Sequence, residues 1–289
     1  MLRLHNITSL ELPELQPYRT LRRQLEHRER GIFVAEGDKV VRRLFESHFG
    51  VESVLITEKW IEEYTPLLNA RTEKEIPVFI ANKEVFEQLT GHHLYQGVLA
   101  VGKIPVSDTL ENILANSPRP RLFAALDGLC DAENLGSVIR NCAAFGVQAM
   151  FIGETCSSPF LRRSVRTSMG TIFQMPMIEL NSGKTSWRRE LPTTEMNCLL
   201  VQILRNLHEA GVRSIAAHPR ADGKVLSQAD FSGDCCVVFG SEGNGVSPAV
   251  FAACDDAVAI PMHCEVDSLN VAAATSVFLY EVNRQRGKS

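Results

Sequence analysis

One segment of the sequence combines glycine, arginine and asparagine residues at spacings that suit substrate binding. Gly136 and Arg140 lie four residues apart in an expected helix over 134–146, so both face the same side. A glycine below an arginine leaves open space for a substrate group, and Asn134 suits the N-cap, with Asn141 nearby. The same pattern also fits an ordinary capped helix with a surface arginine, which the local residues alone favour.

A glycine-rich segment, Gly240-Ser-Glu242-Gly-Asn-Gly245, directly follows an apolar run that is expected to be a buried strand. Three glycines let the backbone approach a ligand closely, as in loops that cradle nucleotides. The spacing differs from the Gly-x-Gly-x-x-Gly of dinucleotide-binding folds, and no Gly-Lys-Ser/Thr follows, as a P-loop requires. A nucleotide-dependent oxidoreductase is therefore the weaker alternative, and a plain tight turn is the structural one.

A third segment joins Ile260-Pro-Met262 to Ser268-Leu269-Asn270-Val271, which opens an apolar terminal helix. Ser268 alone would be explained as a helix cap.

The elements that must position these segments alternate between strand and helix. Strand 121–127, helix 134–146 and strand 149–153 form a β-α-β unit, which implies a parallel sheet. The arginine segment lies where the strand ending at Asp127 gives way to a helix, a place where ligands settle in open α/β sheets. Further strands are expected at 172–178, 214–217, 235–239 and 257–261, and helices near 195–210 and 268–286.

The first third of the chain has the pattern of a separate small α/β domain. Its strands are expected at 32–35, 51–57, 77–81 and 97–101, alternating with helices at 38–48, 59–68 and 83–89, after an arginine-rich helix within 12–30. Prolines and small polar residues then mark a linker. The predicted organisation is a first domain over 1–104, a linker over 105–120 and a second domain over 121–289, with an exposed loop at 181–194.

Composition limits the function classes. The 289 residues contain no apolar run long enough to cross a bilayer, and Met1 to Leu15 does not resemble a secretory signal, so a cytoplasmic location is expected. The eight cysteines are scattered without Cys-x-x-Cys spacing, which favours reduced, buried thiols and no metal site.

The net charge of −4 argues mildly against nucleic acid, although the basic residues are clustered. Interleaved acidic residues make a solvated helix face the alternative to RNA contact. The clusters are Arg19, Arg22, Arg23, Arg28 and Arg30; Lys39, Arg42 and Arg43; and Arg162, Arg163 and Arg166.

Together, the three segments resemble in order and spacing the signature motifs of the SpoU branch of the SPOUT methyltransferases. They are Asn134-Leu-Gly-Ser-Val-Ile-Arg140, Phe239-Gly-Ser-Glu-Gly-Asn-Gly245, and Ile260-Pro-Met262 with Ser268-Leu-Asn-Val271. Arg166-Thr-Ser-Met-Gly170 also resembles a family segment. The resemblance covers 122–286 well, and 22–101 resembles more loosely the ribosomal-protein-like substrate-binding domain that precedes many such catalytic domains.

This resemblance implies transfer of a methyl group from S-adenosylmethionine to a ribose 2′-hydroxyl of RNA. It implies a cofactor pocket formed by Gly240, Gly245, Ile260, Met262 and Leu269. It also implies a catalytic group in which Glu242, Ser268 and Asn270 shape the acceptor site while Asn134 orders Arg140. Arginine holds its proton above about pH 12, so phosphate clamping and hydroxyl polarisation suit it better than a role as base.

The resemblance further implies a deep trefoil knot and a homodimer whose site combines the Arg140 segment of one subunit with the cofactor pocket of the other. The additional first domain favours ribosomal RNA, of the 23S type, over transfer RNA. A transfer-RNA methyltransferase and an inactive RNA-binding or ribosome-assembly relative are the alternatives. The sequence departs from the usual motif at Cys264, where glycine is common, and at Ala272, where serine is common. Both changes fall beside the cofactor loop, so the property that they are expected to affect is the affinity for the cofactor.

Overall fold

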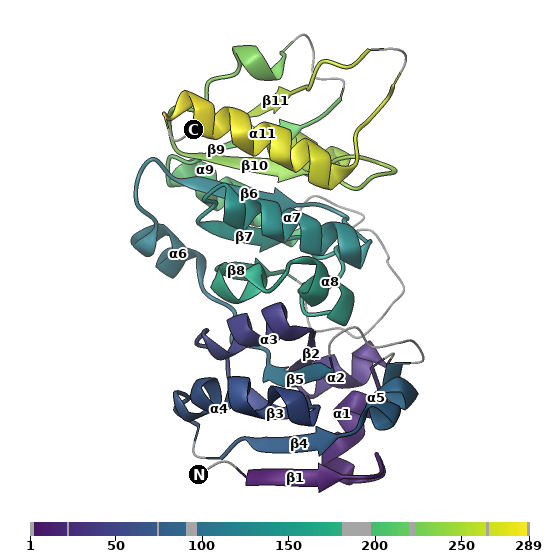
Figure 1. Ribbon diagram of the computed structural model, residues 1–289. Coiled ribbons are helices and arrows are strands. Elements are labelled where there is room, and N and C mark those ends of the chain that lie inside the picture. Colours follow the sequence, from purple (N-terminus) through teal and green to yellow (C-terminus); the bar gives the residue numbers. More distant parts are fainter. Residues whose placement is uncertain are drawn as a thin grey trace. The chain divides into compact units, whose positions relative to one another are not determined.

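The computed structural model describes residues 3–21, 23–73, 75–90, 97–180, 198–219, 224–263 and 266–287. Contacts divide the chain into two units, Met1–Val106 with Pro159–Gln174, and Ser107–Ser158 with Met175–Ser289 (Figure 1). The segment Pro159–Gln174 therefore groups with the first unit, within the range that the sequence analysis gives to the second domain. The predicted domain boundaries stay a prediction.

The first unit is built on a five-stranded mixed sheet in the order β1-β4-β3-β5-β2. Strands β1, β4 and β3 are parallel, and β5 is antiparallel to both β3 and β2. The four strands predicted in this unit are confirmed, and β1 was not predicted. The strands are β1 (Arg3–Ile7), β2 (Ile32–Glu36), β3 (Val51–Ile56), β4 (Pro77–Ala81) and β5 (Val98–Lys103).

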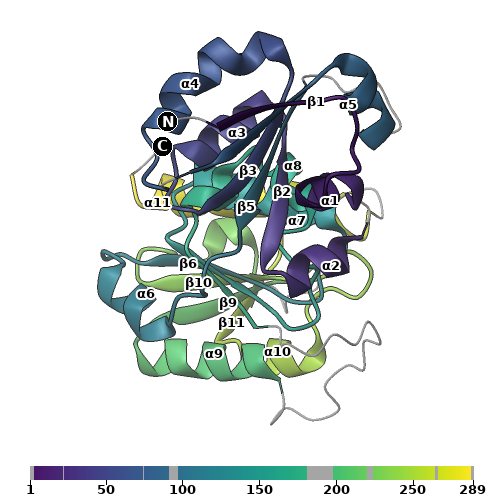
Figure 2. The same ribbon diagram turned by 90° about the horizontal axis from the view of Figure 1, so that it is seen from below.

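Helices cover both faces of this sheet, with α3 and α4 on one side and α1, α2 and α5 on the other (Figure 2). The helix predicted within 12–30 is wrong as a continuous element, because it is broken between Arg19 and Gln24. Its apolar spacing was informative, since Leu15 and Leu21 are both buried. The helices are η1 (Pro13–Leu15), α1 (Gln16–Arg19), α2 (Gln24–Glu29), α3 (Asp38–Phe45), η2 (Glu58–Trp60), α4 (Ile61–Asn69) and α5 (Lys83–Thr90).

An aromatic cluster explains why Pro159–Gln174 groups with the first unit. The ring centroids of Phe33 and Phe173 lie 5.5 Å apart, and those of Phe49 and Phe160 lie 6.1 Å apart. The segment forms α8 (Arg162–Thr167) and η3 (Thr171–Gln174). The strand predicted at 172–178 is therefore wrong in its first part: its apolar residues pack in this cluster, and only β8 (Met177–Glu179) is a strand.

The second unit contains a six-stranded sheet in the order β11-β9-β10-β6-β7-β8, and every pair is parallel, as predicted. Its further elements include α10 and η5, which were not predicted. The bounds are α6 (Leu110–Asn116), β6 (Leu122–Leu126), α7 (Ala132–Ala144), β7 (Ala149–Ile152), α9 (Leu199–Glu209), β9 (Arg213–Ala217), η5 (Leu226–Gln228), β10 (Cys235–Phe239), α10 (Pro248–Ala253), β11 (Asp256–Val258) and α11 (Val271–Gln285).

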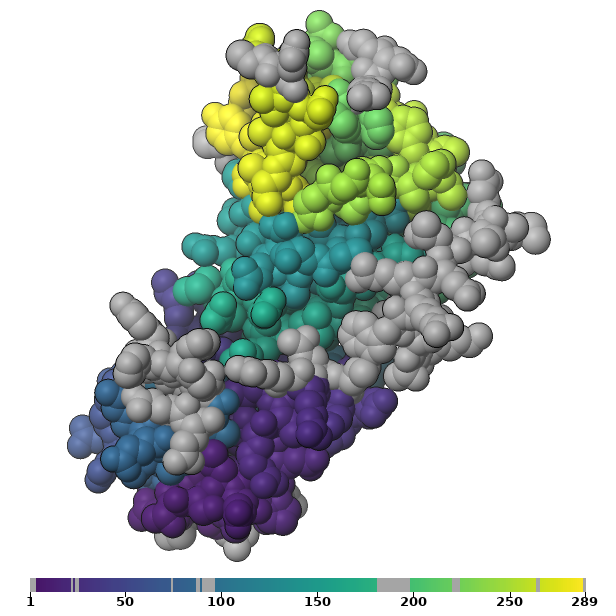
Figure 3. All heavy atoms as spheres, turned by 90° about the vertical axis from the view of Figure 1, so that its right-hand side faces the viewer, coloured from purple at the N-terminus to yellow at the C-terminus, as the bar shows by residue number. Residues whose placement is uncertain are grey.

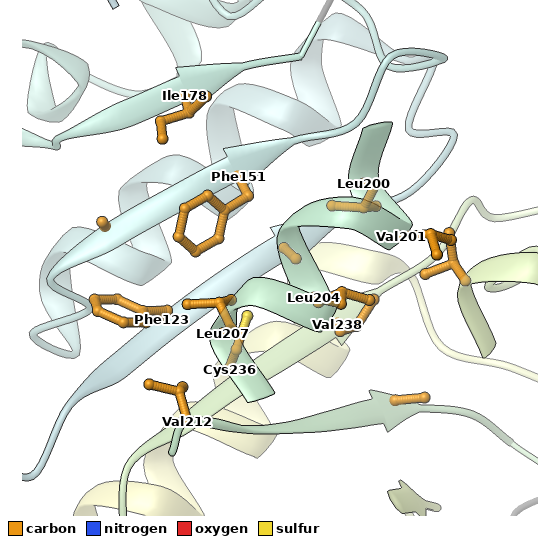
Figure 4. Packing of buried hydrophobic residues seen from close by; sticks show 14 of the residues in the cluster. Phe123, Phe151, Ile178, Leu200, Val201, Leu204, Leu207, Val212, Cys236 and Val238 are labelled. Atoms are coloured by element: carbon orange, nitrogen blue, oxygen red, sulfur yellow. The ribbon is translucent and has the colours of Figure 1, made fainter. Parts of the chain in front are cut away.

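Helices α7 and α11 lie on one face of this sheet, and α9 and α10 lie on the other (Figures 1 and 2). The core beneath α9 packs Phe123, Phe151 and Val238 of three strands against Leu204 and Leu207 of the helix (Figure 4). Burial of each such side chain contributes about 1.5–3 kcal/mol to the stability of the fold. The packed sheet in turn fixes the positions of its strand ends.

Seven cysteines lie among the described residues, and all are free thiols. Cys130 is exposed, so the prediction of buried thiols is wrong at this position. Within the described part of the chain, no group of three or more His, Cys, Asp or Glu residues could hold a metal ion. No helix there has the length and apolarity needed to cross a membrane.

Candidate active site

A cavity of about 410 Å³ opens beyond the carboxyl ends of three adjacent strands of the second unit, β9, β10 and β11. This volume falls in the range of small-molecule sites. All five residues predicted for the cofactor line it, together with Glu242 and Ser268 of the predicted catalytic group. The five are Gly240, Gly245, Ile260, Met262 and Leu269.

The glycine loop after β10 is folded back on itself. Ser241 and Gly245 exchange two backbone hydrogen bonds of 3.0 and 2.9 Å. A Cβ atom at Gly240 would lie 2.0 Å from the carbonyl carbon of Gly245, so only glycine fits there. The loop therefore needs its first glycine for the close approach of two backbone segments, as a tight turn does, and its role as a ligand cradle stays a prediction.

Residues missed by the sequence analysis complete the cavity wall. Ala217 ends β9, and His218 and Pro219 follow it; the ring of His218 packs on Phe251 of α10 with centroids 4.9 Å apart. The strand at 214–217 was predicted, but the order of strands in the sheet was not, so nothing in the sequence placed its end beside the glycine loop.

Asp127 is a buried carboxylate at the end of β6 that sequence reasoning used only as a strand boundary. Its Oδ2 atom accepts a 2.7 Å hydrogen bond from the backbone N–H of Ser247, just beyond the glycine loop. Nearby, burial raises the pKa of the Cys156 thiol to about 12, and Leu129 donates its backbone N–H to this sulfur at 3.3 Å. The first contact fixes the loop after β6 to the loop after β10, and the second fixes it to the loop after β7.

The side chain of Asn134 joins the three predicted segments. Its Nδ2 atom donates to Oε1 of Glu242 in the glycine loop, and its Oδ1 atom accepts a 3.0 Å hydrogen bond from Nδ2 of Asn270. Asn134 belongs to α7 and Asn270 precedes α11, so residues 108 and 136 positions away meet at one side chain. Asn134 uses both its donor and its acceptor in holding the segments together.

The predicted caps of both helices are wrong. Asp131 caps α7, because its Oδ1 atom accepts from the backbone N–H groups of Glu133 and Asn134 at 2.9 and 2.8 Å. Asn270 caps α11 by accepting from the N–H of Ala272 at 2.9 Å, and Ser268 lies before it. An aspartate was available three residues before Asn134, which leaves the Asn134 amide free to bind Glu242 and Asn270.

Arg140 is exposed on α7 and is not among the residues that line the cavity of its own chain. Gly136, four residues earlier, is buried within α7. The open space for a substrate group that the sequence predicts beside it stays a prediction. Cys264 and the loop 181–194 lie outside the described residues.

The sequence profile of the SpoU rRNA Methylase family matches residues 121–198 and 186–280, the part of the chain that holds the cavity and the Asn134 junction. The chain belongs to the SpoU rRNA methylase family. The resemblance seen in its motifs is confirmed, and the chain is an RNA methyltransferase. The profile of MRM3-like substrate binding domains matches residues 13–100, which confirms the predicted α/β organisation with a substrate-binding domain before the catalytic one.

Relatives of this SpoU chain share most of its length. An uncharacterized tRNA/rRNA methyltransferase of Mycobacterium bovis is 31% identical over 258 residues, which cover 88% of this chain and 82% of the relative. The 23S rRNA (guanosine-2′-O-)-methyltransferase of Shewanella oneidensis is 29% identical over 240 residues, which cover 80% of this chain and 90% of that one.

Solved structures share the fold of this SpoU chain. The AdoMet-bound rRNA methyltransferase from Sinorhizobium meliloti aligns with a TM-score of 0.77 at 23% identity, over 97% of this chain and 98% of that one. The SpoU methyltransferase AviRb from Streptomyces viridochromogenes aligns with a TM-score of 0.75 at 24% identity, over 94% and 96%.

Proposed function

We propose that this SpoU-family chain methylates a ribose 2′-hydroxyl of RNA, with S-adenosylmethionine as the methyl donor. The observation that carries the proposal is the junction at Asn134, which links the arginine helix, the glycine loop and the start of α11 beside the cavity. The chemistry needs one site for the donor and one for the acceptor hydroxyl. This junction fixes Glu242, which lines the cavity, and Asn270, the two residues that we propose to shape the acceptor site.

The cavity suits an adenosine-containing cofactor. It is bounded by backbone-rich segments around Gly240 and Ile260 and by apolar side chains of Phe239, Leu269 and Phe278. Such a wall offers peptide groups to the edge of a base and apolar surface to its faces. S-adenosylmethionine, when bound, supplies an electrophilic methyl group on a sulfonium. The structure of the Sinorhizobium meliloti protein that shares this fold holds AdoMet.

The residues of the chain have separate roles in binding the donor and the acceptor. Gly240, Ile260 and Leu269 hold the donor, while Glu242 and Asn270 shape the acceptor site and are themselves fixed by Asn134. The Arg140 guanidinium clamps an RNA phosphate and polarises the ribose hydroxyl, which eases loss of its proton. Correct placement of the hydroxyl supplies much of the rate acceleration.

A homodimer would bring Arg140 of one subunit to the cavity of the other. In support, the carboxyl-terminal segment exposes apolar side chains: Val266 is 51%, Leu269 41%, Val277 40% and Tyr280 55% accessible. Figure 3 shows this segment, in yellow, beside the yellow-green atoms of the glycine-loop region. This apolar surface is exposed next to a cavity that Arg140 of the same chain does not line. Such a surface is suited to contact with a second copy of the chain.

Ribosomal RNA of the 23S type is the proposed substrate. The Shewanella oneidensis relative is named for 2′-O-methylation of guanosine in 23S rRNA, and residues 13–100 match a substrate-binding domain. The free thiols suit a reducing compartment, so we place the reaction in the cytoplasm. The trefoil knot is part of the same proposal, as a feature of the family.

The test is methylation of ribosomal RNA and transfer RNA with a donor that carries an isotopically labelled methyl group. After digestion to nucleosides, mass spectrometry separates ribose-methylated from base-methylated products. We expect label on the ribose of a ribosomal RNA nucleoside. Label on a base would contradict the ribose assignment, and ribose label in transfer RNA alone would contradict the substrate.

A further inference from the structure

Two asparagine side chains tie α7 to α11, at opposite ends of α11 and about one turn apart at the carboxyl end of α7. Near the candidate site, Nδ2 of Asn141 on α7 donates a 2.7 Å hydrogen bond to the carbonyl oxygen of Ala272 in the first turn of α11. At the far end, Nδ2 of Asn283 on α11 donates a 2.9 Å hydrogen bond to the carbonyl oxygen of Phe145, which follows α7. The two links have the same chemistry and differ in their distance from the site along α11.

The link through Asn141 closes a ring with the site junction. Asn134 and Asn141 are seven residues apart on α7, about two turns, so they lie on the same side of the helix. Asn134 accepts from Asn270, and Asn270 accepts from the N–H of Ala272, whose carbonyl accepts from Asn141. The start of α11 is thus held to α7 at two points that span the turns leading to Arg140.

We infer that Asn141 is a positioning residue for methyl transfer, which acts by fixing Arg140 and the cap of α11 in one register. This inference rests on the proposed function. Asn141 directly follows Arg140, so its pinned amide restricts the backbone from which the guanidinium extends. It also holds Ala272, the residue whose N–H the Asn270 cap engages.

The family motif directs attention to Asn134, Arg140 and Asn270, and the contacts add Asn141 as the fourth member of the group. A half-buried amide that bonds a neighbouring helix would otherwise be explained as ordinary helix docking. The distinction between the two roles is testable because Asn283 supplies the same kind of docking bond without lying at the site.

The experiment compares Asn141→Ala and Asn141→Leu with the matched variants Asn283→Ala and Asn283→Leu in the full chain. Leucine keeps the branched shape of the asparagine side chain, with larger methyl groups, and removes the donor. We expect the Asn141 variants to lower kcat about tenfold or more, because a misplacement of about 1 Å can cost about 100-fold. Their kcat should fall by a larger factor than their calorimetric Kd for S-adenosylmethionine rises, and the Asn283 variants should lower Tm similarly while kcat is kept.

Unchanged kcat in the Asn141 variants would overturn the inference. So would an equal loss of kcat in both pairs, which is the result of general helix docking, or a loss concentrated in cofactor binding. A second readout does not depend on activity: hydrogen exchange in a peptide over 268–276 should accelerate in Asn141→Ala and not in Asn283→Ala. If the parent protein transfers no methyl group, the proposed function fails, and the exchange result still decides whether Asn141 orders the start of α11.

Discussion

At the scale of single residues, the candidate site is held together by hydrogen bonds of polar side chains. Asn134 works as a junction because Asp131 performs the capping role that the sequence analysis gave to Asn134. The motif resemblance singled out Asn134, but the local pattern assigned it the wrong contact, since cap preference cannot distinguish two acceptable residues three positions apart. Buried Asp127 escaped notice because its partner is 120 residues away.

Gly240→Ala tests the close approach in the glycine loop. The added Cβ would lie 2.0 Å from backbone carbon, which no side-chain movement relieves, so we expect a loss of about 1–3 kcal/mol or more and a weaker Kd for S-adenosylmethionine. Urea unfolding and calorimetry measure the two effects. Gly243→Ala in the same loop meets nothing within 4 Å and is the stability control. Equal stability of the two variants would contradict the packing argument.

At the scale of elements, the parallel order of the second sheet and most of its strands could be predicted because buried parallel strands have short apolar runs between helical segments. Strand β1 could not, because its apolar residues, Leu4 and Ile7, form neither a continuous apolar run nor an alternating pattern. The run at 172–178 was wrongly predicted to be a strand throughout, because an apolar residue such as Phe173 packs equally well in an aromatic cluster and in a strand. The order of strands, which places His218 at the cavity, depends on long-range pairing that local patterns do not record.

The carboxyl end of α3 carries a pH-dependent clamp. The Arg71 guanidinium donates to the carbonyl oxygens of Phe45 and Ser47 at 2.8 and 2.7 Å and to Glu73 at 2.6 Å. Hydrogen bonding to Arg71 lowers the pKa of Glu73 from 4.5 to about 2. The folded state thus binds this proton less tightly than the unfolded chain, and the stabilisation present above pH 4.5 is lost as pH falls toward 2.

We therefore expect Glu73→Gln to flatten the acid side of the stability profile. Urea unfolding at pH 5 and pH 3 should show a smaller loss of unfolding free energy between the two in this variant than in the parent. Glu111→Gln, on an exposed position of α6, is the matched control and should leave the parent slope. A parental slope in Glu73→Gln would show that the clamp does not respond to protonation.

At the scale of the whole molecule, one parallel sheet brings three segments from distant parts of the chain to one place. Its strand ends form the cavity, and helices α7 and α11 on one face carry the Asn134 junction and Arg140. The order of the motifs indicated that the three segments converge. The hydrogen bonds of Asn134 show which side chains join them. Arg140 is exposed and does not line the cavity of its own chain. The proposed completion of the site by a second subunit requires this placement.

The most direct test of the central claim is Arg140→Ala, measured by methyl transfer to ribosomal RNA and by calorimetry with S-adenosylmethionine. The account predicts that transfer is abolished while the Kd for the donor is unchanged, because the cavity and the catalytic arginine are separate parts of the site. Near-parental turnover in this variant would contradict it.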